Sequence, residues 1–451
     1  MHAVQAETGP EPRRAVRMEL ARTLARMGWL PLQVLDFLLR RSALRGELRA
    51  DLELPARIDP EPRADFDRAR PLRVFLSCAE ASGEIHAVNF VRELRAEAQR
   101  QGAPAPSVSG LGGRRLGAEG VECIGDPVSR AVMGIHGVRQ ALPYYLELLE
   151  RCAEHFRSER PEVLVMVDSP ALHVPLGRIA KRYGIPVLHF VTPQHWAWAP
   201  WRTADYARAV DRALTILPFE RAWFTRRGLD VAYVGHPLLD RLAGLPASRA
   251  RDSLRIALLP GSRARVIDLN LPWMLGTLAR LRERDPRIEV QVLQADDQHR
   301  FRIEEHVAGA NASSWARIEV GELHHALPEC ALAFAVSGTV LLDLLHHRLP
   351  TVCIYRVRSR REIAMYRHGL CTPYFASINL LAAGEVVPEF CFRGDGPRTQ
   401  VVDALERLLF DRGERARTRR GLERAADRLG PPGACRRAAM HALSLARREP
   451  A

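Results

Sequence analysis

From Leu72 onwards, the chain alternates short, nearly continuous apolar runs with segments of helical periodicity. Runs such as RVFLSC, VLVMVDSP and IPVLHFVTP are each followed by turn residues and then by a helical pattern. Strands that are apolar on both faces and separated by helices are typical of a parallel sheet covered on both sides. The pattern breaks at LAGLPASRARDS and restarts at RIALLPGSR. We therefore predict an α/β protein with two doubly wound domains, over residues 71–245 and 246–451, that face a cleft.

Residues 1–70 differ from the rest and are predicted to form a helical extension and a linker. Leu20, Leu24 and Met27 recur at helical spacing, and residues 29–39 are densely apolar. This pattern predicts a helix over residues 16–48, interrupted at Pro31, before a linker rich in proline and charge. A basic amphipathic segment of this kind lies in a membrane interface or covers an adjacent domain, and the sequence leaves both interpretations open.

The charge of the chain favours anionic partners. Its 451 residues carry 66 basic and 53 acidic side chains, a formal net charge of +13, and Lys181 is the only lysine. Such one-sided use of arginine first indicates an arginine-biased proteome. The positive excess would also suit nucleic acid, phospholipid headgroups or phosphorylated substrates. No recognisable nucleic-acid-binding module accompanies the charge, so we predict no nucleic-acid partner.

The cysteines and the N-terminus indicate an intracellular enzyme. The eight cysteines are scattered singly without a C-x-x-C pair, which gives no support for a zinc ribbon or a redox motif. Several lie in apolar runs, as expected of buried thiols in a reducing compartment. Residues 1–14 lack the apolar core of a signal peptide, and no run approaches the roughly 20 apolar residues of a spanning helix. We expect a cytoplasmic location.

In the second domain, LLPGSR is a candidate phosphate-binding turn. Gly261 and Ser262 leave a predicted strand, and Arg263 follows directly. Ligands of open parallel sheets lie beyond the carboxyl ends of the strands. Backbone N–H groups at such a turn can hold a phosphate that a guanidinium pairs with bidentately. Pro-Gly-Ser is also ordinary turn chemistry, so this motif alone is weak.

A second loop of this domain has the same character. AVSGT leads from a strand into a helix and places Ser337, Gly338 and Thr339 at a helix N-terminus, where anions are favoured. Asp343 follows one turn later and could accept from a ribose hydroxyl. Two such loops suggest a nucleotide diphosphate. The absence of G-x-x-x-x-G-K-[ST] and G-x-G-x-x-G argues against a P-loop ATPase and an ordinary dinucleotide enzyme.

In the first domain, carboxylates follow two strands. Asp168 ends VLVMVD and could act as a general base, although an Asp before Ser-Pro is also a common turn former. Glu80 and Glu84 flank Ser82, where a helix cap is the alternative to a functional role. The histidines are irregularly spaced without H-E-x-x-H, so no metal site is predicted. The aromatic cluster QHWAWAPWR indicates either a packed loop or a contact for a sugar or acyl chain.

Taken together, these strings resemble the lipid-A-disaccharide synthase family. The resemblance covers roughly residues 72–445, and its specificity comes from the order of the motifs more than from any one of them. The matching motifs, in chain order, are AEASGEIHA (79–87), AVMG (131–134), VDSP (167–170), PQHWAW (193–198), LPFE (217–220), VGHPL (234–238), LLPGSR (258–263), SGTVLLD (337–343) and INLLAAGEVVPE (378–389).

The resemblance implies a GT-B type glycosyltransferase with two Rossmann-like domains, peripheral on the inner face of the inner membrane. Such an inverting enzyme transfers 2,3-diacylglucosamine from its UDP derivative to 2,3-diacylglucosamine 1-phosphate (lipid X), giving lipid A disaccharide 1-phosphate and UDP. The implied partners are these two substrates and an anionic inner-membrane surface, and no cofactor is expected. The part of the chain that carries the resemblance, residues 72–445, contains no Asp-x-Asp motif, which agrees with metal-independent chemistry. Oligomeric state and acyl-chain length are left open.

The resemblance also assigns roles to individual residues. Asp168 matches the favoured base, Glu80 the first carboxylate, and Arg263 the arginine that meets the diphosphate. The family's nucleotide-side motifs carry over onto Gly261, Ser262, Ser337, Gly338, Thr339, Asp343 and Asn379.

The chain also departs from the family pattern in the residues around these positions. A retained base and diphosphate arginine in an altered surrounding fit a changed donor or acceptor preference, or reduced activity, better than loss of catalysis. The alternatives are a GT-B transferase for another UDP-sugar or lipid acceptor, and a UDP-sugar-binding protein that is not a transferase. The departures are Ala79, Glu84, Gly137, Ala171, His173, Val266, Asp343 and Phe392.

Overall fold

The computed structural model describes residues 9–63, 68–130, 135–245, 253–321 and 323–446. For residues 135–140 it describes the backbone only. The described chain forms two compact units. The first unit comprises residues 1–43, 56–241 and 431–451, and the second comprises residues 44–55 and 242–430. The chain therefore returns to the first unit at its C-terminus, whereas the sequence alone grouped residues 246–451 together.

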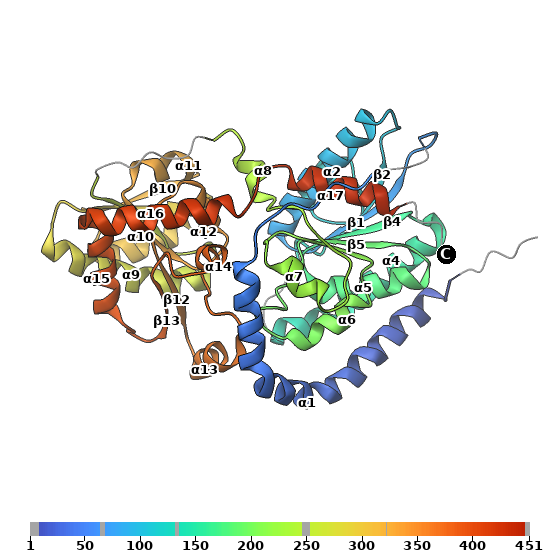
Figure 1. Cartoon of the computed structure of the whole chain (residues 1–451), viewed down its shortest axis with the longest axis horizontal. Helices are drawn as coiled ribbons and strands as arrows, with labels where there is room; N and C mark the ends of the chain where they lie inside the picture. Colours follow the sequence, from blue (N-terminus) through green and yellow to red (C-terminus); the bar gives the residue numbers. More distant parts are fainter. Residues whose placement is uncertain (1–8, 64–67, 131–134, 246–252, 322, 447–451) are drawn as a thin grey trace, which may run out of the picture. The chain divides into compact units, whose positions relative to one another are not determined.

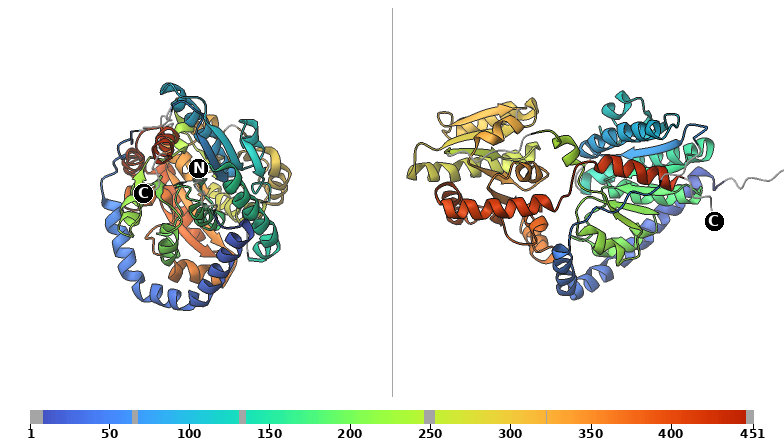
Figure 2. Two further views of the ribbon diagram at one scale, coloured as in Figure 1. Left: turned by 90° about the vertical axis from the view of Figure 1, so that its right-hand side faces the viewer. Right: turned by 45° about the horizontal axis from the view of Figure 1, so that its top comes forward.

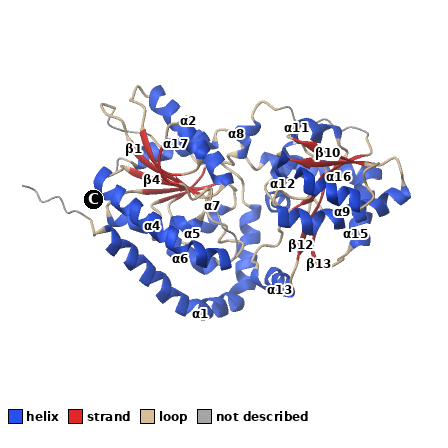
Figure 3. Ribbon diagram, turned by 180° about the vertical axis from the view of Figure 1, so that it is seen from behind, coloured by secondary structure: helices blue, strands red, loops and turns tan. Residues whose placement is uncertain are grey.

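The first unit is built on a seven-stranded parallel sheet of order β3-β2-β1-β4-β5-β6-β7. Its central strand VLVMV is buried at every position, as expected when helices cover both faces. Figure 3 shows helices on both sides of the strands. The strands are β1 (Arg73–Cys78), β2 (Ser107–Leu111), β3 (Glu122–Gly125), β4 (Val163–Val167), β5 (Val187–Phe190), β6 (Arg212–Thr215) and β7 (Val231–Tyr233).

The helices of this unit follow the strands in the predicted alternation. The predicted helix over 83–100 is α2, which begins two residues earlier, and the helix predicted to reach Tyr183 is α5. The helices are α2 (Ala81–Arg100), α3 (Arg114–Ala118), α4 (Ile135–Glu159), α5 (Pro170–Arg182), the 3₁₀ helix η1 (Pro200–Arg202), α6 (Thr203–Ala207), α7 (Glu220–Thr225), α8 (Leu238–Leu242) and α17 (Ala434–Leu445).

The second unit has a six-stranded parallel sheet of order β10-β9-β8-β11-β12-β13. The prediction of two doubly wound sheets is thus confirmed. Residues 122–125 and 389–393 were not predicted as strands, because β3 and β13 are partly exposed sheet edges without a long apolar run. The strands are β8 (Arg255–Leu259), β9 (Glu289–Gln294), β10 (Ala316–Val320), β11 (Leu332–Val336), β12 (Thr351–Val357) and β13 (Glu389–Arg393).

Helices also flank this second sheet. The helix predicted over 271–282 starts earlier, because α9 begins directly after Arg263, and the helical C-terminal stretch predicted from Arg398 is confirmed. The helices are α9 (Ala264–Arg284), η2 (Asp297–His299), α10 (Arg300–Gly309), α11 (Leu323–Ala326), η3 (Leu327–Glu329), α12 (Val340–His346), α13 (Arg360–Gly369), α14 (Ser377–Ala382), α15 (Arg398–Phe410) and α16 (Arg412–Asp427).

The predicted interruption of the N-terminal helix at Pro31 is wrong. Helix α1 (Pro12–Glu53) continues through Pro31 and follows a curved course (Figures 1 and 2). A proline inside a helix removes one backbone hydrogen bond and bends the axis. Residues 27–32 are all exposed, so water can satisfy the carbonyl that lacks its partner. Among the described residues, no helix combines the length and apolarity needed to cross a bilayer.

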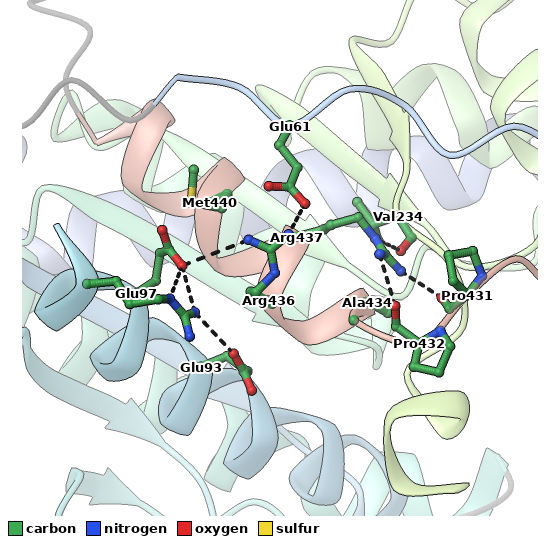
Figure 4. A network of polar contacts seen from close by, with 12 residues as sticks. Glu61, Glu93, Glu97, Val234, Pro431, Pro432, Ala434, Arg436, Arg437 and Met440 are labelled. Carbon is green, nitrogen blue, oxygen red and sulfur yellow. Dashed lines mark hydrogen bonds and ion pairs between the residues drawn. The ribbon is translucent and has the colours of Figure 1, made fainter. Parts of the chain in front are cut away.

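The C-terminal helix α17 is fastened to the first unit by both polar and apolar contacts (Figure 4). Asp240 in α8 accepts from the backbone N–H groups of Ala434 and Cys435, at 3.0 and 2.8 Å, and so caps the helix. Arg437 donates to the carbonyls of Val234, Pro431 and Pro432. Small side chains on the opposite face pack against α2 in one core. Long-range contacts therefore place α17 in the first unit.

Candidate active site

The turn between β4 and α5 carries Asp168 in an unusual backbone conformation. Asp168 and Ser169 have φ angles of 59° and 47°, so two successive non-glycine residues are left-handed. Such residues cost roughly 1–3 kcal/mol each and persist where the surroundings hold them in place. Gly83 in α2 packs against this turn, since a Cβ there would lie 3.3 Å from the Val167 carbonyl oxygen and 3.7 Å from the Asp168 Cβ.

Two buried histidines hold the Asp168 backbone. His173 Nδ1 lies 2.5 Å, and His189 Nε2 2.9 Å, from the Asp168 carbonyl oxygen. A carbonyl only accepts, so both ring nitrogens must donate, and this fixes both tautomers. His173 Nε2 then accepts from the Ser77 hydroxyl at 2.8 Å. Burial lowers the pKa of His173 to about 3 and of His189 to about 4, which keeps both rings neutral.

The Asp168 carboxyl is suited to proton transfer near neutral pH. Burial, followed by the nearby negative charge of Glu80, raises its pKa to about 6, although the Ser169 N–H opposes this shift. A base with a pKa close to the working pH is effective because it is ionised and still basic. The structure thus brings Asp168 and Glu80 into electrostatic contact at neighbouring strand exits, β4 and β1.

Glu84 has a structural role that the sequence did not indicate. Its carboxylate Oε1 accepts from the N–H groups of Arg115 and Leu116, both at 3.1 Å, and so caps the start of α3. Gly113 leaves room for this carboxylate, because a Cβ there would come 2.8 Å from the Glu84 oxygen. The alternative in which Ser82 caps α2 is wrong: the N-cap is Glu80, and no side chain makes the cap hydrogen bond.

A buried carboxylate missed by the sequence analysis joins the motifs PQHWAW and LPFE. Glu220 accepts from Trp196 Nε1 at 2.9 Å and from the N–H groups of Ile216 and Leu217 at 3.1 and 3.0 Å. Complete burial raises its pKa to about 7 despite these donors and the Thr192 hydroxyl. Glu220 therefore ties the loops after β5 and β6 together. In the sequence, Glu220 is marked only as an acidic residue at the end of an apolar run, and this pattern is too common to identify a buried carboxylate.

The three tryptophans of QHWAWAPWR have different surroundings. Trp196 is buried beside Phe219, with ring centroids 4.8 Å apart. Trp201 is half-buried and packs against Phe37 of α1. Trp198 is 47% exposed and lies under the Arg202 guanidinium. The packed-loop interpretation holds for Trp196, whereas Trp198 is available to a ligand.

In the second unit, the turn after β8 is open to solvent. Gly261 has a φ of 108°, and a Cβ there would come 2.6 Å from Val266 Cγ1. Ser262 and Arg263 are exposed, and Arg263 is the N-cap residue of α9. Its carbonyl accepts from the N–H groups of Val266 and Ile267. The exposed Arg263 guanidinium thus stands at the start of a 21-residue helix, where the positive end of the helix dipole adds to its charge.

The loop after β11 is also accessible. Gly338 and Thr339 are exposed, Ser337 is half-buried, and Thr339 is the N-cap residue of α12 without a side-chain cap. Asp343 differs, because only 7% of its side chain is exposed and its carboxylate lies 3.6 Å from His324 Nε2. The structure therefore keeps the first three predicted residues at the surface and Asp343 beneath them.

Asn379 is completely buried and uses its amide within the chain. Its oxygen accepts from the N–H groups of Val386 and Val387, and its nitrogen donates to the Val387 carbonyl and to Glu389 Oε2. Glu389 also accepts from the N–H groups of Phe375 and Ala376. Burial raises the pKa of Glu389. Asn379 therefore shapes the loop after α14 and orients Glu389, a residue the sequence analysis did not single out.

Two further predictions concern this region. The motif AVMG (131–134) lies outside the described residues. Among the described residues, no group of three or more His, Cys, Asp or Glu side chains is placed to hold a metal ion. The first unit thus carries a strained, histidine-held carboxylate, and the second unit carries two exposed turns.

The two parallel, doubly wound sheets give the chain a fold of the GT-B type. A solved structure with this fold is the S. aureus MnaA–UDP co-structure, with a TM-score of 0.53 and 11% identity, covering 81% of this chain and 94% of that one. At this identity the likeness is one of fold.

The particular family follows from sequence comparison. The family model described as lipid-A-disaccharide synthetase matches residues 74–444. The lipid-A-disaccharide synthases of Myxococcus xanthus (strain DK1622) and Anaeromyxobacter dehalogenans (strain 2CP-1) are each 32% identical, over 83% of this chain and 98% of theirs. The chain belongs to the lipid-A-disaccharide synthase family and is a glycosyltransferase of lipid A biosynthesis. The match leaves out the first 73 residues, which include α1.

Proposed function

We propose that this protein transfers 2,3-diacylglucosamine from UDP-2,3-diacylglucosamine to the 6-hydroxyl of 2,3-diacylglucosamine 1-phosphate, with inversion at the anomeric carbon. The observation that carries the proposal is the Asp168 carboxyl, which is fixed at a strand exit and has a pKa of about 6. The named relatives support the substrates, and the +13 net charge suits two anionic lipids. The reaction places the enzyme on the inner face of the inner membrane.

In the proposed reaction, the acceptor oxygen forms a bond to the anomeric carbon as the bond from that carbon to the diphosphate oxygen breaks. Asp168 takes the proton of the acceptor hydroxyl, and UDP leaves with the electron pair. Burial and, to a smaller extent, the charge of Glu80 keep the pKa of Asp168 high. Arg263 and the backbone of Gly261 and Ser262 stabilise the charge that develops on the diphosphate.

The remaining nucleotide-side residues have proposed roles of two kinds. Ser337, Gly338 and Thr339 contact the nucleotide through their exposed turn. Asp343 and Asn379 are buried, so their proposed role is to support the residues that contact the nucleotide. For Asn379 the role is to position the loop that contains Glu389.

The test is UDP release from UDP-2,3-diacylglucosamine with and without the acceptor. Acceptor-dependent release should fall by about 10²–10⁴-fold in Asp168→Asn, which retains the shape of the side chain without its basicity. The control is Asp297→Asn, at a well-exposed surface carboxylate. Unchanged release in Asp168→Asn would refute its role as the base.

The same assay separates the alternatives. If the protein binds UDP but releases none with this acceptor, the result supports the alternative of a GT-B transferase for another UDP-sugar or lipid acceptor. Ala171, which departs from the family pattern and is exposed three positions after Asp168, favours this second candidate. If UDP is released equally with and without the acceptor, the result supports the other alternative, a UDP-sugar-binding protein that is not a transferase.

A further inference from the structure

The middle of α1 exposes large apolar side chains that no part of the described structure covers. Their exposed fractions range from 44% to 77%, and they occupy a segment that the family match does not include. Monomeric proteins rarely expose contiguous apolar surface of this kind without a partner. These residues, which we call the α1 apolar segment, are Leu24, Met27, Trp29, Leu30, Leu32, Leu35, Leu38 and Leu39.

The opposite side of the same helix is firmly attached to the first unit. Glu19 is almost fully buried and pairs with Arg178 at 2.6 Å, and Arg178 also pairs with Asp205. Arg22 and Arg26 of α1 pair with Asp205 as well. The exposure of the α1 apolar segment is therefore a property of a docked helix, not of a loose one.

Helical geometry places the anchors and the apolar residues on different faces. With 100° per residue, the anchors Glu19 and Phe37 project in the same direction. Six members of the α1 apolar segment project into an arc of roughly 140° on the other side. They are Leu24, Met27, Leu32, Leu35, Leu38 and Leu39.

The charges around this arc indicate what covers it. Arg14 and Arg17 are exposed and continue the arc towards the N-terminus, and Asp36, the one acidic residue from position 20 to 39, is paired with Arg40 at 2.8 Å. An apolar face next to arginines fits the acyl chains and phosphates of an anionic bilayer. A second copy of the chain would bring its own arginines to the same place, so charge repulsion disfavours self-association there.

We propose that the α1 apolar segment lies in the surface of an anionic phospholipid membrane and holds the first unit against it. Leucines enter the acyl region, Trp29 lies at headgroup level, and Arg14 and Arg17 meet lipid phosphates. Under the proposed function, which this inference extends, the lipid substrates reach the enzyme from the same surface.

The test is flotation of the full chain with vesicles of phosphatidylethanolamine and phosphatidylglycerol that contain no substrate. The variant Leu24→Gln/Leu35→Gln/Leu39→Gln removes three exposed apolar groups and should lower the bound fraction at least about 10-fold. The control Phe301→Gln/Met365→Gln/Phe410→Gln changes three exposed apolar residues elsewhere and should bind like the wild type. Binding of the wild type should also weaken at high salt.

Three results would overturn the proposal. The first is wild-type binding by the α1 variant, and the second is equal loss in the control. The third is a change of oligomeric state by light scattering without a change in flotation, which would assign the face to a second copy. UDP release on detergent-dispersed substrates is measured in parallel. Failure of the transfer reaction leaves flotation unchanged, so the two proposals fail separately.

Discussion

The two units differ in how they hold their candidate residues at the strand exits: Asp168 of the first unit is mostly buried and fixed, and Arg263 of the second is exposed. In the first unit, the turn at Asp168 has two left-handed residues, and two neutral histidines donate to the Asp168 carbonyl. The buried carboxyl of Glu220 follows another strand of the same sheet. In the second unit, Ser262, Arg263 and Gly338 are exposed on simple turns. A base needs a low-dielectric and fixed environment to tune its pKa, whereas a diphosphate needs accessible N–H groups and positive charge. The difference suggests one chemical task for each unit.

After Asp168→Asn, the largest expected effect tests the exposed side of this comparison. Arg263→Ala should lower kcat by about 10²-fold or more, because the charge on the leaving diphosphate loses its guanidinium. Its Tm should stay unchanged, since the side chain is exposed. The matched control is Arg265→Ala, two residues further on and also exposed. An equal loss of activity in both variants would show general electrostatics in place of a specific contact.

The pH dependence of the free energy of unfolding tests the buried carboxyl of the first unit. The pKa of Asp168 is raised from 3.8 to about 6 on folding, so the folded state favours the protonated carboxyl. The resulting stabilisation is complete below pH 3.8 and is lost as the pH rises through about 6. Asp168→Asn removes this loss, and its stability relative to wild type should rise by about 2–3 kcal/mol between pH 4 and pH 7. Denaturant unfolding at both pH values measures it, and a constant difference between the two proteins would contradict the raised pKa.

Glu220 tests whether the first unit depends on buried acceptors. Trp196 Nε1 and the N–H groups of Ile216 and Leu217 all donate to this carboxylate, so Glu220→Gln turns an amide N–H₂ towards donors and should destabilise the protein by about 1–3 kcal/mol. Urea unfolding with tryptophan fluorescence reports the change, because Trp196 loses its acceptor. Glu305→Gln, at an exposed position of α10 in the second unit, is the comparison variant and should change little. Equal stability of both variants would remove Glu220 as a structural tie.

His173 should have the smallest effect on activity, because it acts on Asp168 only through the backbone. His173→Ala removes the Nδ1 donor and should lower kcat about 10-fold with little change in KM, because the carboxyl is less well positioned. His173→Asn retains an N–H donor at this position and should recover most of the rate. A raised KM without rescue by asparagine would indicate direct contact with substrate.

The sequence by itself determined the α/β class, the two sheets and the place of Asp168, Arg263 and Ser337–Thr339 at strand exits. These features depend on local patterns: apolar runs for buried strands, and polar turn residues after them. The same kind of local information could not find β3 and β13, whose edge positions leave them half-exposed. The motifs and their order also sufficed to indicate the family.

Only the tertiary structure decided which polar side chains are used within the fold. Glu84 caps α3 from 31 positions away, Asn379 turns its amide inward, and His173 and His189 meet on one carbonyl. It also decided that α17 returns to the first unit and that α1 exposes its leucines. None of these contacts follows from a local pattern, because a hydrogen bond or an ion pair leaves no periodic signal in the residues that make it.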